Sequence, residues 1–217
     1  MKPTQTLALV GATFIGSTMA VAALADTPMV RPVAHMATDT APKRVIDAAE
    51  ARLSTDADGV TMTMKTAELT PGHVTTAWWV IVTRPELCET SPCEADDIIG
   101  RAERVGTQIT YADGAVNSPE GTARFVGFLP SGSVEAGWFD QSLDNPTEME
   151  VHLVLNDHGP LIADIAASML TTYRGGCSDE SLPPPFPASA KADGVSGPNT
   201  CQLIQAAIFM QHDKASN

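Results

Sequence analysis

The feature that most constrains the fold is a change to strict two-residue alternation after the turn sequence at 56–59. Val60, Met62 and Met64 alternate with three polar residues, which is the pattern of a half-buried strand. A Thr-Pro-Gly turn signal at 70–72 follows, and residues 73–83 are dense in Val, Thr, Ile and Trp. The two segments therefore predict an antiparallel hairpin.

Three later segments, at 106–111, 121–129 and 148–155, also have the composition of strands and are separated by turn-rich stretches. Their short spacing favours an antiparallel β-sandwich over a parallel sheet. We therefore predict a mainly β fold, with a β-sandwich domain that spans residues 58–217.

Two segments near the C-terminus depart from the alternating pattern. Residues 161–173 carry a helical stripe of apolar side chains that stops at two glycines, Gly175 and Gly176. Residues 201–210 suit either a second helix or a last strand, and we favour a closing strand tethered by a disulfide. The expected sandwich therefore carries one or two short helices.

The first 25 residues have the pattern of a cleaved export signal. Lys2 precedes a mostly apolar run at 7–24, and the small-x-small sequence Ala23-Leu24-Ala25 ends it. We predict that residues 1–25 are removed, that the protein is secreted or periplasmic, and that no membrane anchor remains after cleavage.

Residues 26–57 precede the alternating pattern and are predicted to form an N-terminal leader. Residues 26–41 are rich in Thr, Pro and Ala, which is typical of a mobile segment. From Pro42 to Leu53 the apolar residues share one helical face, and proline is favoured in a first turn. A short helix is therefore expected there, outside the sandwich domain.

Export also determines how the four cysteines are interpreted, because an even number in an oxidising compartment indicates disulfides. Pairing of nearest neighbours, Cys88–Cys93 and Cys177–Cys201, is our choice among three connectivities. The second bond would hold a loop containing 182–187, which is too rich in proline to join a helix or a central strand. Zinc binding is the alternative, but the spacings C-x4-C and C-x23-C fit no common zinc ribbon.

Trp78 and Trp79 are adjacent in the second predicted strand of the hairpin. Neighbouring strand residues point to opposite faces of a sheet. An exposed indole could stack on a sugar or a partner. We favour the alternative, in which a second layer covers the outer indole and both are buried.

Three of the five histidines lie where a sheet rim could bring them together. His73 begins a strand, His152 lies within one, and His158 lies in a turn just beyond it. Converging imidazoles could bind copper or zinc, with Asp157 or Glu150 completing the coordination shell. The alternative is structural: a strand histidine belongs to a hydrogen-bond network, or a turn histidine faces water. If the three histidines cluster, the loss of His158 should abolish metal binding and cost little stability, because a turn residue supports little packing.

The order of several motifs resembles that of a functionally unassigned group of secreted bacterial proteins. The matching segments are the PGHxxTxWWV motif within 70–80, the flanks of the first cysteine pair, the HLVLxxHGP motif within 150–160 and the GGC motif at 175–177. The resemblance covers most of residues 58–210 and implies no mechanism. That group carries a histidine where this chain has Phe209, so a histidine site in the group would be incomplete here. The His152 strand is also faintly similar to chordin-type β-domains, which implies a β-sandwich and no activity.

Composition and motifs together favour a binding or structural role. The formal net charge of −13 would repel the phosphates of nucleic acid, so we expect no nucleic-acid partner. The sequence lacks the G-x-S-x-G, H-E-x-x-H and EF-hand signatures of common catalytic or calcium sites. We therefore predict an exported, non-catalytic β-sandwich protein with an extracellular or periplasmic partner that the sequence does not identify. The alternative function is copper or zinc binding by His73, His152 and His158.

Overall fold

A computed structural model describes residues 27–37 and 42–210, and the predicted signal peptide lies outside them. Eight antiparallel strands form one sheet in the order β5-β4-β9-β10-β1-β2-β3-β6. Their bounds are Met29–His35 (β1), Arg44–Thr55 (β2), Gly59–Thr66 (β3), His73–Val82 (β4), Thr107–Val116 (β5), Ala123–Pro130 (β6), Glu150–Pro160 (β9) and Gln202–Met210 (β10). Gly132–Ser133 (β7) and Ser142–Leu143 (β8) form a separate two-stranded sheet.

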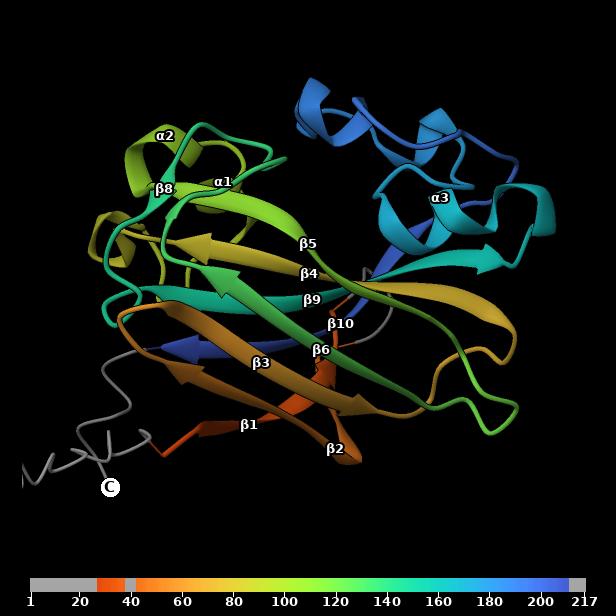
Figure 1. Ribbon diagram of the computed structural model, residues 1–217, viewed down its shortest axis with the longest axis horizontal. Coiled ribbons are helices and arrows are strands. Elements are labelled where there is room, and N and C mark those ends of the chain that lie inside the picture. The colour runs from red at the N-terminus through yellow and green to blue at the C-terminus, as the bar shows by residue number, and fades with distance from the viewer. Residues whose placement is uncertain (1–26, 38–41, 211–217) are drawn as a thin grey trace, which may run out of the picture.

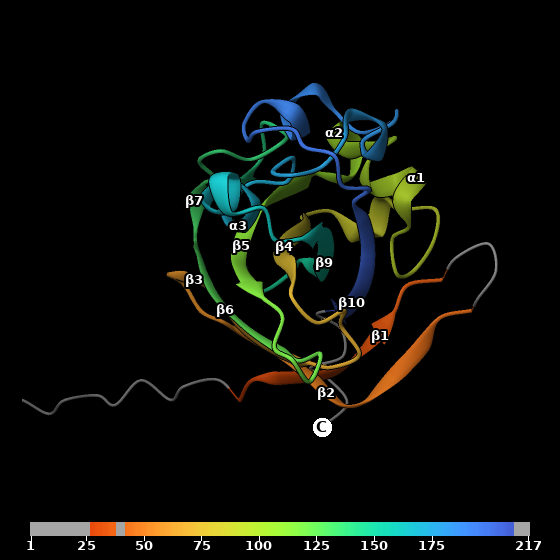
Figure 2. The same ribbon diagram turned by 90° about the vertical axis from the view of Figure 1, so that its right-hand side faces the viewer.

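The large sheet curls into a nearly closed barrel, which corrects the prediction of a β-sandwich. Figure 2 looks into this ring of strands, with β5 and β6, the two ends of the order, brought side by side. Across this seam the Asp113 carboxylate accepts a hydrogen bond of 2.9 Å from the backbone N–H of Val126. A side chain thus takes the place of a regular strand ladder at the seam.

Side chains fill the interior of the barrel, as expected for a ring of this number of strands. The inward-facing positions of β3 and β4 alternate along each strand, so that Met62, Met64, Trp79 and Ile81 belong to one apolar cluster. Phe125 and Phe209 complete it from β6 and β10. The strands predicted at 60–65 and 73–83 are confirmed, as are those around 106–111, 121–129 and 148–155. The predicted hairpin between the first two is wrong, because β3 pairs with β2 and β6, whereas β4 pairs with β5 and β9.

The predicted helix from Pro42 to Leu53 is wrong, because these residues belong to strand β2. Opposite Val33 the pairing of β2 with β1 shifts register, and Ala48 has a positive φ of 59°. This bulge separates the buried Ile46 and Ala49 by three positions, which imitates a helical turn. Beyond the bulge, burial returns to a period of two, since alternate residues from Ala49 to Thr55 face the core.

The leader and the domain boundary predicted at residue 58 are corrected for the same reason. Strand β1 runs through the predicted leader and pairs with β2 along one edge and with β10 along the other. The pairing with β10 is short, Ala34 with Ala206 and His35 with Gln205. The barrel therefore starts at Met29, and the N-terminal strands join it to the C-terminal strand.

A second layer covers the outer face of β4, β5, β9 and β10. Figure 1 shows the short helices and loops gathered on this side of the barrel. They are Pro85–Leu87 (η1), Ala95–Ile98 (α1), Ala102–Val105 (α2), Ala163–Ile165 (η2), Ala166–Thr171 (α3), Asp179–Ser181 (η3) and Ala188–Lys191 (η4). The helix predicted at 161–173 is confirmed in part as η2 and α3, and the closing strand at 201–210 is confirmed as β10.

The second layer explains the two adjacent tryptophans. Trp79 points into the barrel and is 1% exposed, whereas Trp78 points outward and is 5% exposed beneath the second layer. The prediction that both indoles are covered on opposite faces is confirmed. By contrast, Val126 and Phe128 lie on the uncovered half of the barrel and remain about half exposed.

Both predicted disulfides are present. One joins two parts of the second layer, and the other joins the second layer to the barrel. Cys88–Cys93 closes the segment before α1, and Cys177–Cys201 closes the Pro-rich loop onto the start of β10. No cysteine among the described residues is free. No helix within 27–37 or 42–210 is long and apolar enough to cross a membrane.

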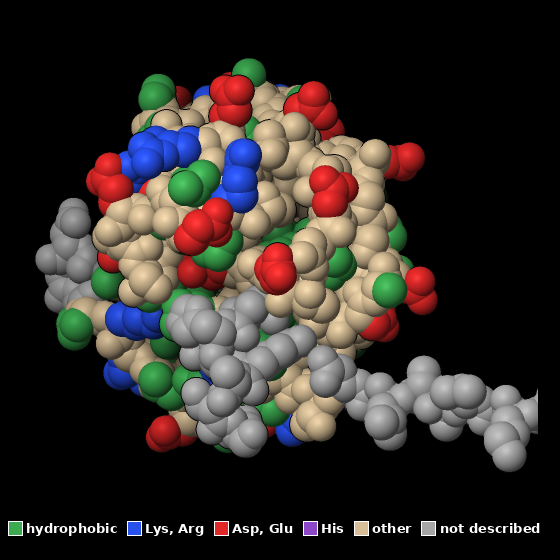
Figure 3. All heavy atoms as spheres, turned by 90° about the vertical axis from the view of Figure 1, so that its left-hand side faces the viewer, with side chains coloured by type: hydrophobic (Ala, Val, Ile, Leu, Met, Phe, Trp, Pro, Cys, Tyr) green, Lys and Arg blue, Asp and Glu red, His purple; other side chains and the backbone are tan. Residues whose placement is uncertain are grey.

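The end of the barrel at the left of Figure 1 is seen face-on in Figure 3. Asp and Glu side chains are spread over this face beside a few Lys and Arg, and hydrophobic side chains show in a hollow between them. The charges are mixed, without a continuous basic surface in this view.

We expect a Cys177→Ala/Cys201→Ala double variant to lose about 3 kcal/mol of unfolding free energy, because this bond closes a sequence separation of 24 residues. The matched Cys88→Ala/Cys93→Ala variant, with a separation of 5 residues, should lose about 2 kcal/mol. Urea denaturation followed by circular dichroism measures both. Equal losses, or a larger loss from the shorter loop, would contradict the loop-closure explanation.

Candidate functional site

His73 lies at the start of β4 and pairs with an acidic residue of the neighbouring strand. Its Nδ1 is 3.0 Å and 3.1 Å from the two carboxylate oxygens of Asp157. Asp157 Oδ1 also accepts the backbone N–H of Gly159 at 2.8 Å. His73 is therefore held as one half of a partly buried pair at the end of the strand.

His152 forms a second, separate pair on the outer face of β9. Its Nε2 is 2.6 Å from Oε1 of Glu150, two residues earlier on the same face of the strand. The same Oε1 accepts the backbone N–H of Cys93 at 2.8 Å. Both side chains are almost fully buried. One oxygen of the Glu150 carboxylate thus contacts both the backbone of Cys93, in the first disulfide, and the ring of His152.

His158 is not a turn residue, contrary to the prediction, because β9 continues to Pro160. The side chain is fully buried, with Nδ1 2.7 Å from the carbonyl oxygen of Gly175 and Nε2 2.7 Å from Oγ1 of Thr76. A carbonyl oxygen only accepts, so we assign the proton to Nδ1 and make Nε2 the acceptor. Burial lowers the pKa of this imidazole, which favours the neutral form.

The structure does not bring the three histidines to one metal site. His152 and His158 are six residues apart on one strand, a separation of about 20 Å. His73 contacts Asp157, whose side chain points to the face opposite that of its neighbour His158. The carboxylates named as additional ligands, Asp157 and Glu150, do contact histidines, but each contacts a different one.

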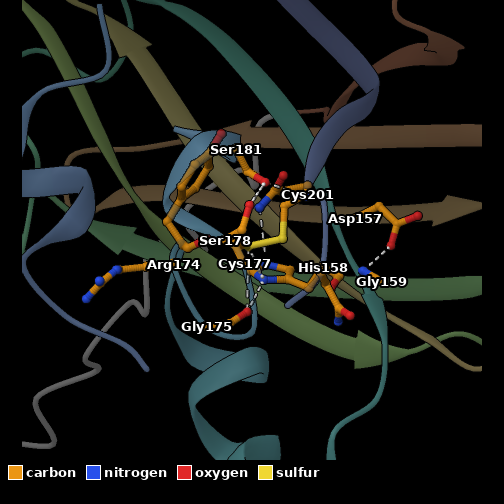
Figure 4. The surroundings of a disulfide bond; sticks show 12 residues. Asp157, His158, Gly159, Arg174, Gly175, Cys177, Ser178, Ser181 and Cys201 are labelled. Atoms are coloured by element: carbon orange, nitrogen blue, oxygen red, sulfur yellow. Dashed lines mark hydrogen bonds between the residues drawn. A yellow bond between two sulfur atoms is a disulfide. The ribbon is translucent and has the colours of Figure 1, made fainter. Parts of the chain in front are cut away.

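The imidazole of His158 also lies beside the second disulfide, as Figure 4 shows. Its Nδ1 is 3.4 Å from Sγ of Cys177, and the ligand atoms of His158, Cys177 and Cys201 lie within 4.8 Å of one another. The two sulfurs are bonded to each other, and Nδ1 donates its proton to Gly175. In this state the three atoms form a packed structural cluster rather than a set of metal ligands.

A chain of hydrogen bonds connects this cluster to the outer tryptophan. Nε1 of Trp78 donates to Oγ1 of Thr76 at 2.8 Å, and the Thr76 hydroxyl donates to His158. His158 in turn donates to Gly175 in the loop that ends at Cys177. These hydrogen bonds restrict the orientation of the Trp78 indole, and they connect β4, β9 and the second layer.

An apolar cavity of about 410 Å³ lies between the barrel and the second layer. Its floor is the outer face of β4, β9 and β10, to which Val80, Val154 and Ile208 contribute. Part of the lining comes from the first disulfide and α1, and another part comes from Pro185 and Phe186 of the Pro-rich loop. Cavities of this size and character are typical of small-molecule sites.

Four aromatic side chains line the cavity and contact one another. The ring centroid of Tyr173 lies 5.0 Å from that of Trp78 and 4.7 Å from that of Trp138, in edge-to-face geometry. Phe186 packs against Trp138 with centroids 6.0 Å apart. Burial raises the pKa of Tyr173 far above its ordinary value, so its hydroxyl stays protonated.

Few polar groups face this cavity. His152 lines it and has no hydrogen-bond partner other than Glu150 within the described parts of the chain. Two charged residues of opposite sign, Lys43 and Glu94, also line it, and both are exposed. The cavity is therefore mainly apolar. It has one buried imidazole, and the formal charges of its two exposed charged residues cancel.

Comparison of the chain with protein-family models, with curated proteins and with solved structures gave no significant match. The assignment of the site therefore depends on its geometry and chemistry.

Local sequence patterns indicated His152, Glu150 and Trp78 as candidates, but not the cavity that His152 and Trp78 line. Glu150 and His152 are two residues apart in a strand, a spacing that places both side chains on one face. The pairing of these two residues could therefore be predicted from the sequence. The contributions of Trp138, Tyr173 and Phe186 to the cavity could not, because each comes from a loop whose path over the sheet depends on tertiary packing.

The lowered pKa of His158 predicts a loss of stability on acidification. Below about pH 6.5 the unfolded chain binds a proton at this histidine, whereas the folded chain binds it only at lower pH. The free energy of unfolding should therefore fall as the pH drops, with His158 contributing up to about 1.4 kcal/mol per pH unit.

A His158→Gln variant should be less stable at neutral pH and should show a smaller decrease in stability between about pH 7 and pH 5. Urea denaturation at a series of pH values measures the two slopes. An unchanged slope in the variant would show that His158 does not carry this pH dependence.

Proposed function

We propose that this protein is an exported, non-catalytic binding protein that holds a small, largely apolar ligand between its barrel and its second layer. The observation that carries the proposal is the apolar cavity of about 410 Å³. The barrel interior is an unsuitable alternative, because buried side chains such as Trp79, Phe125 and Phe209 occupy it.

The two disulfides support this proposal. Cys93 lines the cavity and belongs to the first disulfide, while Phe186 lies in the loop closed by the second. Two parts of the cavity lining are thus each held by a disulfide. Walls that are ordered before binding reduce the entropy lost when a ligand is captured, which favours a binding role.

The surroundings of His152 favour binding over nucleophilic catalysis. Its hydrogen-bond partner is a carboxylate, Glu150, rather than a serine, threonine or cysteine side chain. All four cysteines are joined in two disulfides, so none of them supplies a thiolate nucleophile. The acidic charge of the chain disfavours nucleic acid as the partner, as its composition predicts.

Binding of the neutral fluorophore N-phenyl-1-naphthylamine provides the first test. We expect a saturable rise in its fluorescence at a stoichiometry of one per chain. An Ile208→Trp variant, which places a larger side chain on the cavity floor, should reduce the affinity at least about tenfold, because the filled volume excludes the probe.

Val126→Trp is the matched control, since Val126 lies on the uncovered half of the barrel and is 49% exposed. It adds the same side chain away from the cavity and should leave the affinity unchanged. Equal affinities in all three proteins would place the probe elsewhere and contradict the proposal.

A further inference from the structure

His152 is the buried imidazole that lines the cavity, and its environment determines which ligand group it can meet. Oε1 of Glu150 is a carboxylate oxygen, which accepts hydrogen bonds, and it already accepts from the backbone N–H of Cys93. In the neutral imidazole we therefore assign the single proton to Nε2, which donates to Glu150. Nδ1 is then an acceptor, and it has no partner in the described parts of the chain.

An acceptor on an apolar wall favours a ligand that carries a hydrogen-bond donor. Burying Nδ1 against a purely apolar ligand would leave it without any hydrogen bond, which is costly. A hydroxyl of the ligand would satisfy it. The rigid Glu150–His152 pair holds the acceptor in a fixed direction, since both residues stand on one strand and Cys93 fixes the carboxylate.

The remaining walls favour an aromatic ring. Trp78, Trp138 and Tyr173 already pack in tilted or edge-to-face contacts with centroid distances of 4.7 to 5.7 Å. An additional flat ring would extend this cluster with the same geometry.

The charges around the cavity favour a neutral ligand. Lys43 and Glu94 are the charged residues that line it, and their formal charges cancel. An anionic ligand would also approach a chain of net charge −13 and the neighbouring Glu150 carboxylate.

From these observations we infer that the cavity binds neutral aromatic compounds that carry a hydroxyl group, with the hydroxyl donating to Nδ1 of His152. The inference rests on the proposed function and adds the class of ligand to it. His152 acts as a specificity-determining residue: the aromatic walls hold any apolar ring, and the imidazole selects those that bear a donor.

Four related probes test the inference, each titrated into the wild-type protein by calorimetry. They are 4-propylphenol, propylbenzene without the hydroxyl, 4-propylanisole with an acceptor in its place, and 4-propylcyclohexanol without the aromatic ring. We expect 4-propylphenol to bind about five- to tenfold more tightly than propylbenzene, as one hydrogen bond implies. The anisole and the cyclohexanol should both bind more weakly than the phenol.

Substitution of His152 should remove the preference for the hydroxyl but retain binding of propylbenzene. Because His152→Phe alone leaves the buried Glu150 without its partner, we pair it with Glu150→Gln in one double variant. Tyr173→Phe is the matched control. It removes the hydroxyl of another residue that lines the cavity, keeps the aromatic ring, and should keep the preference for 4-propylphenol over propylbenzene.

A second measurement does not require a stable variant. The ¹⁵N resonance of His152 Nδ1 in the wild-type protein should shift when 4-propylphenol binds and should shift less when propylbenzene binds, because only the phenol donates to this nitrogen. Absence of that difference would overturn the assignment of Nδ1 as the acceptor.

The outcomes separate the inference from the proposed function. Equal affinities for 4-propylphenol and propylbenzene, with both competing against N-phenyl-1-naphthylamine, would leave the apolar binding function in place and overturn the role of His152. Tighter binding of 4-propylanisole would show that His152 donates instead, and would also overturn it. Binding of none of the probes, the naphthylamine included, would overturn both.

Discussion

Strands β4 and β9 are buried on both faces, and this constraint determines the rest of the architecture. From Trp78 to Val82 each residue is buried, with alternate side chains entering the barrel core and the outer cluster. β9 is also buried from Val151 to Leu155: its odd-numbered residues enter the barrel core, while His152 and Val154 face the second layer. A barrel alone would expose one of these faces to water, so the chain needs a second layer. The loops of that layer contain little regular structure, and disulfides hold them where strand pairing does not.

The polar groups of the outer face lie where the two layers meet. Thr76 and His158 form a chain between Trp78 and the carbonyl oxygen of Gly175, and Glu150 joins His152 to the backbone of Cys93. Each chain ends next to a disulfide. Buried polar groups without partners would be costly here, so these contacts allow one docking position of the loops on the sheet and disfavour others.

Local patterns in the sequence predicted most of the strands, because alternation over a half-buried surface is a local property. They failed at β2, where the bulge at Ala48 spaces two inward residues as a helix would. They also failed to distinguish a sandwich from a barrel. That distinction depends on which edges meet, and the meeting of β5 with β6 and of β1 with β10 involves residues far apart in the chain.

The candidate site was predictable only in part for a similar reason. Glu150 lies two residues from its partner His152 in the sequence, whereas Asp157 and its partner His73 are 84 residues apart and meet through the pairing of β4 with β9. The predicted grouping of the histidines was wrong, because residues with the same chemistry occur at both ends and on both faces of one strand. His158 was assigned to a turn because Gly159 and Pro160 follow it, yet β9 carries these residues within the sheet.

Because the cavity lies outside the barrel, the residues that shape the cavity are largely different from those that stabilise the barrel core. Residues such as Phe186 and Pro185 shape the cavity but belong to a loop closed by its own disulfide, whereas residues such as Phe125 stabilise the barrel without contact with the cavity. Substitutions in sites that share no partners have nearly additive effects. Substitutions in the loop and in the barrel core should therefore change the free energy of unfolding independently, so the loop can vary in sequence without altering how the barrel core packs.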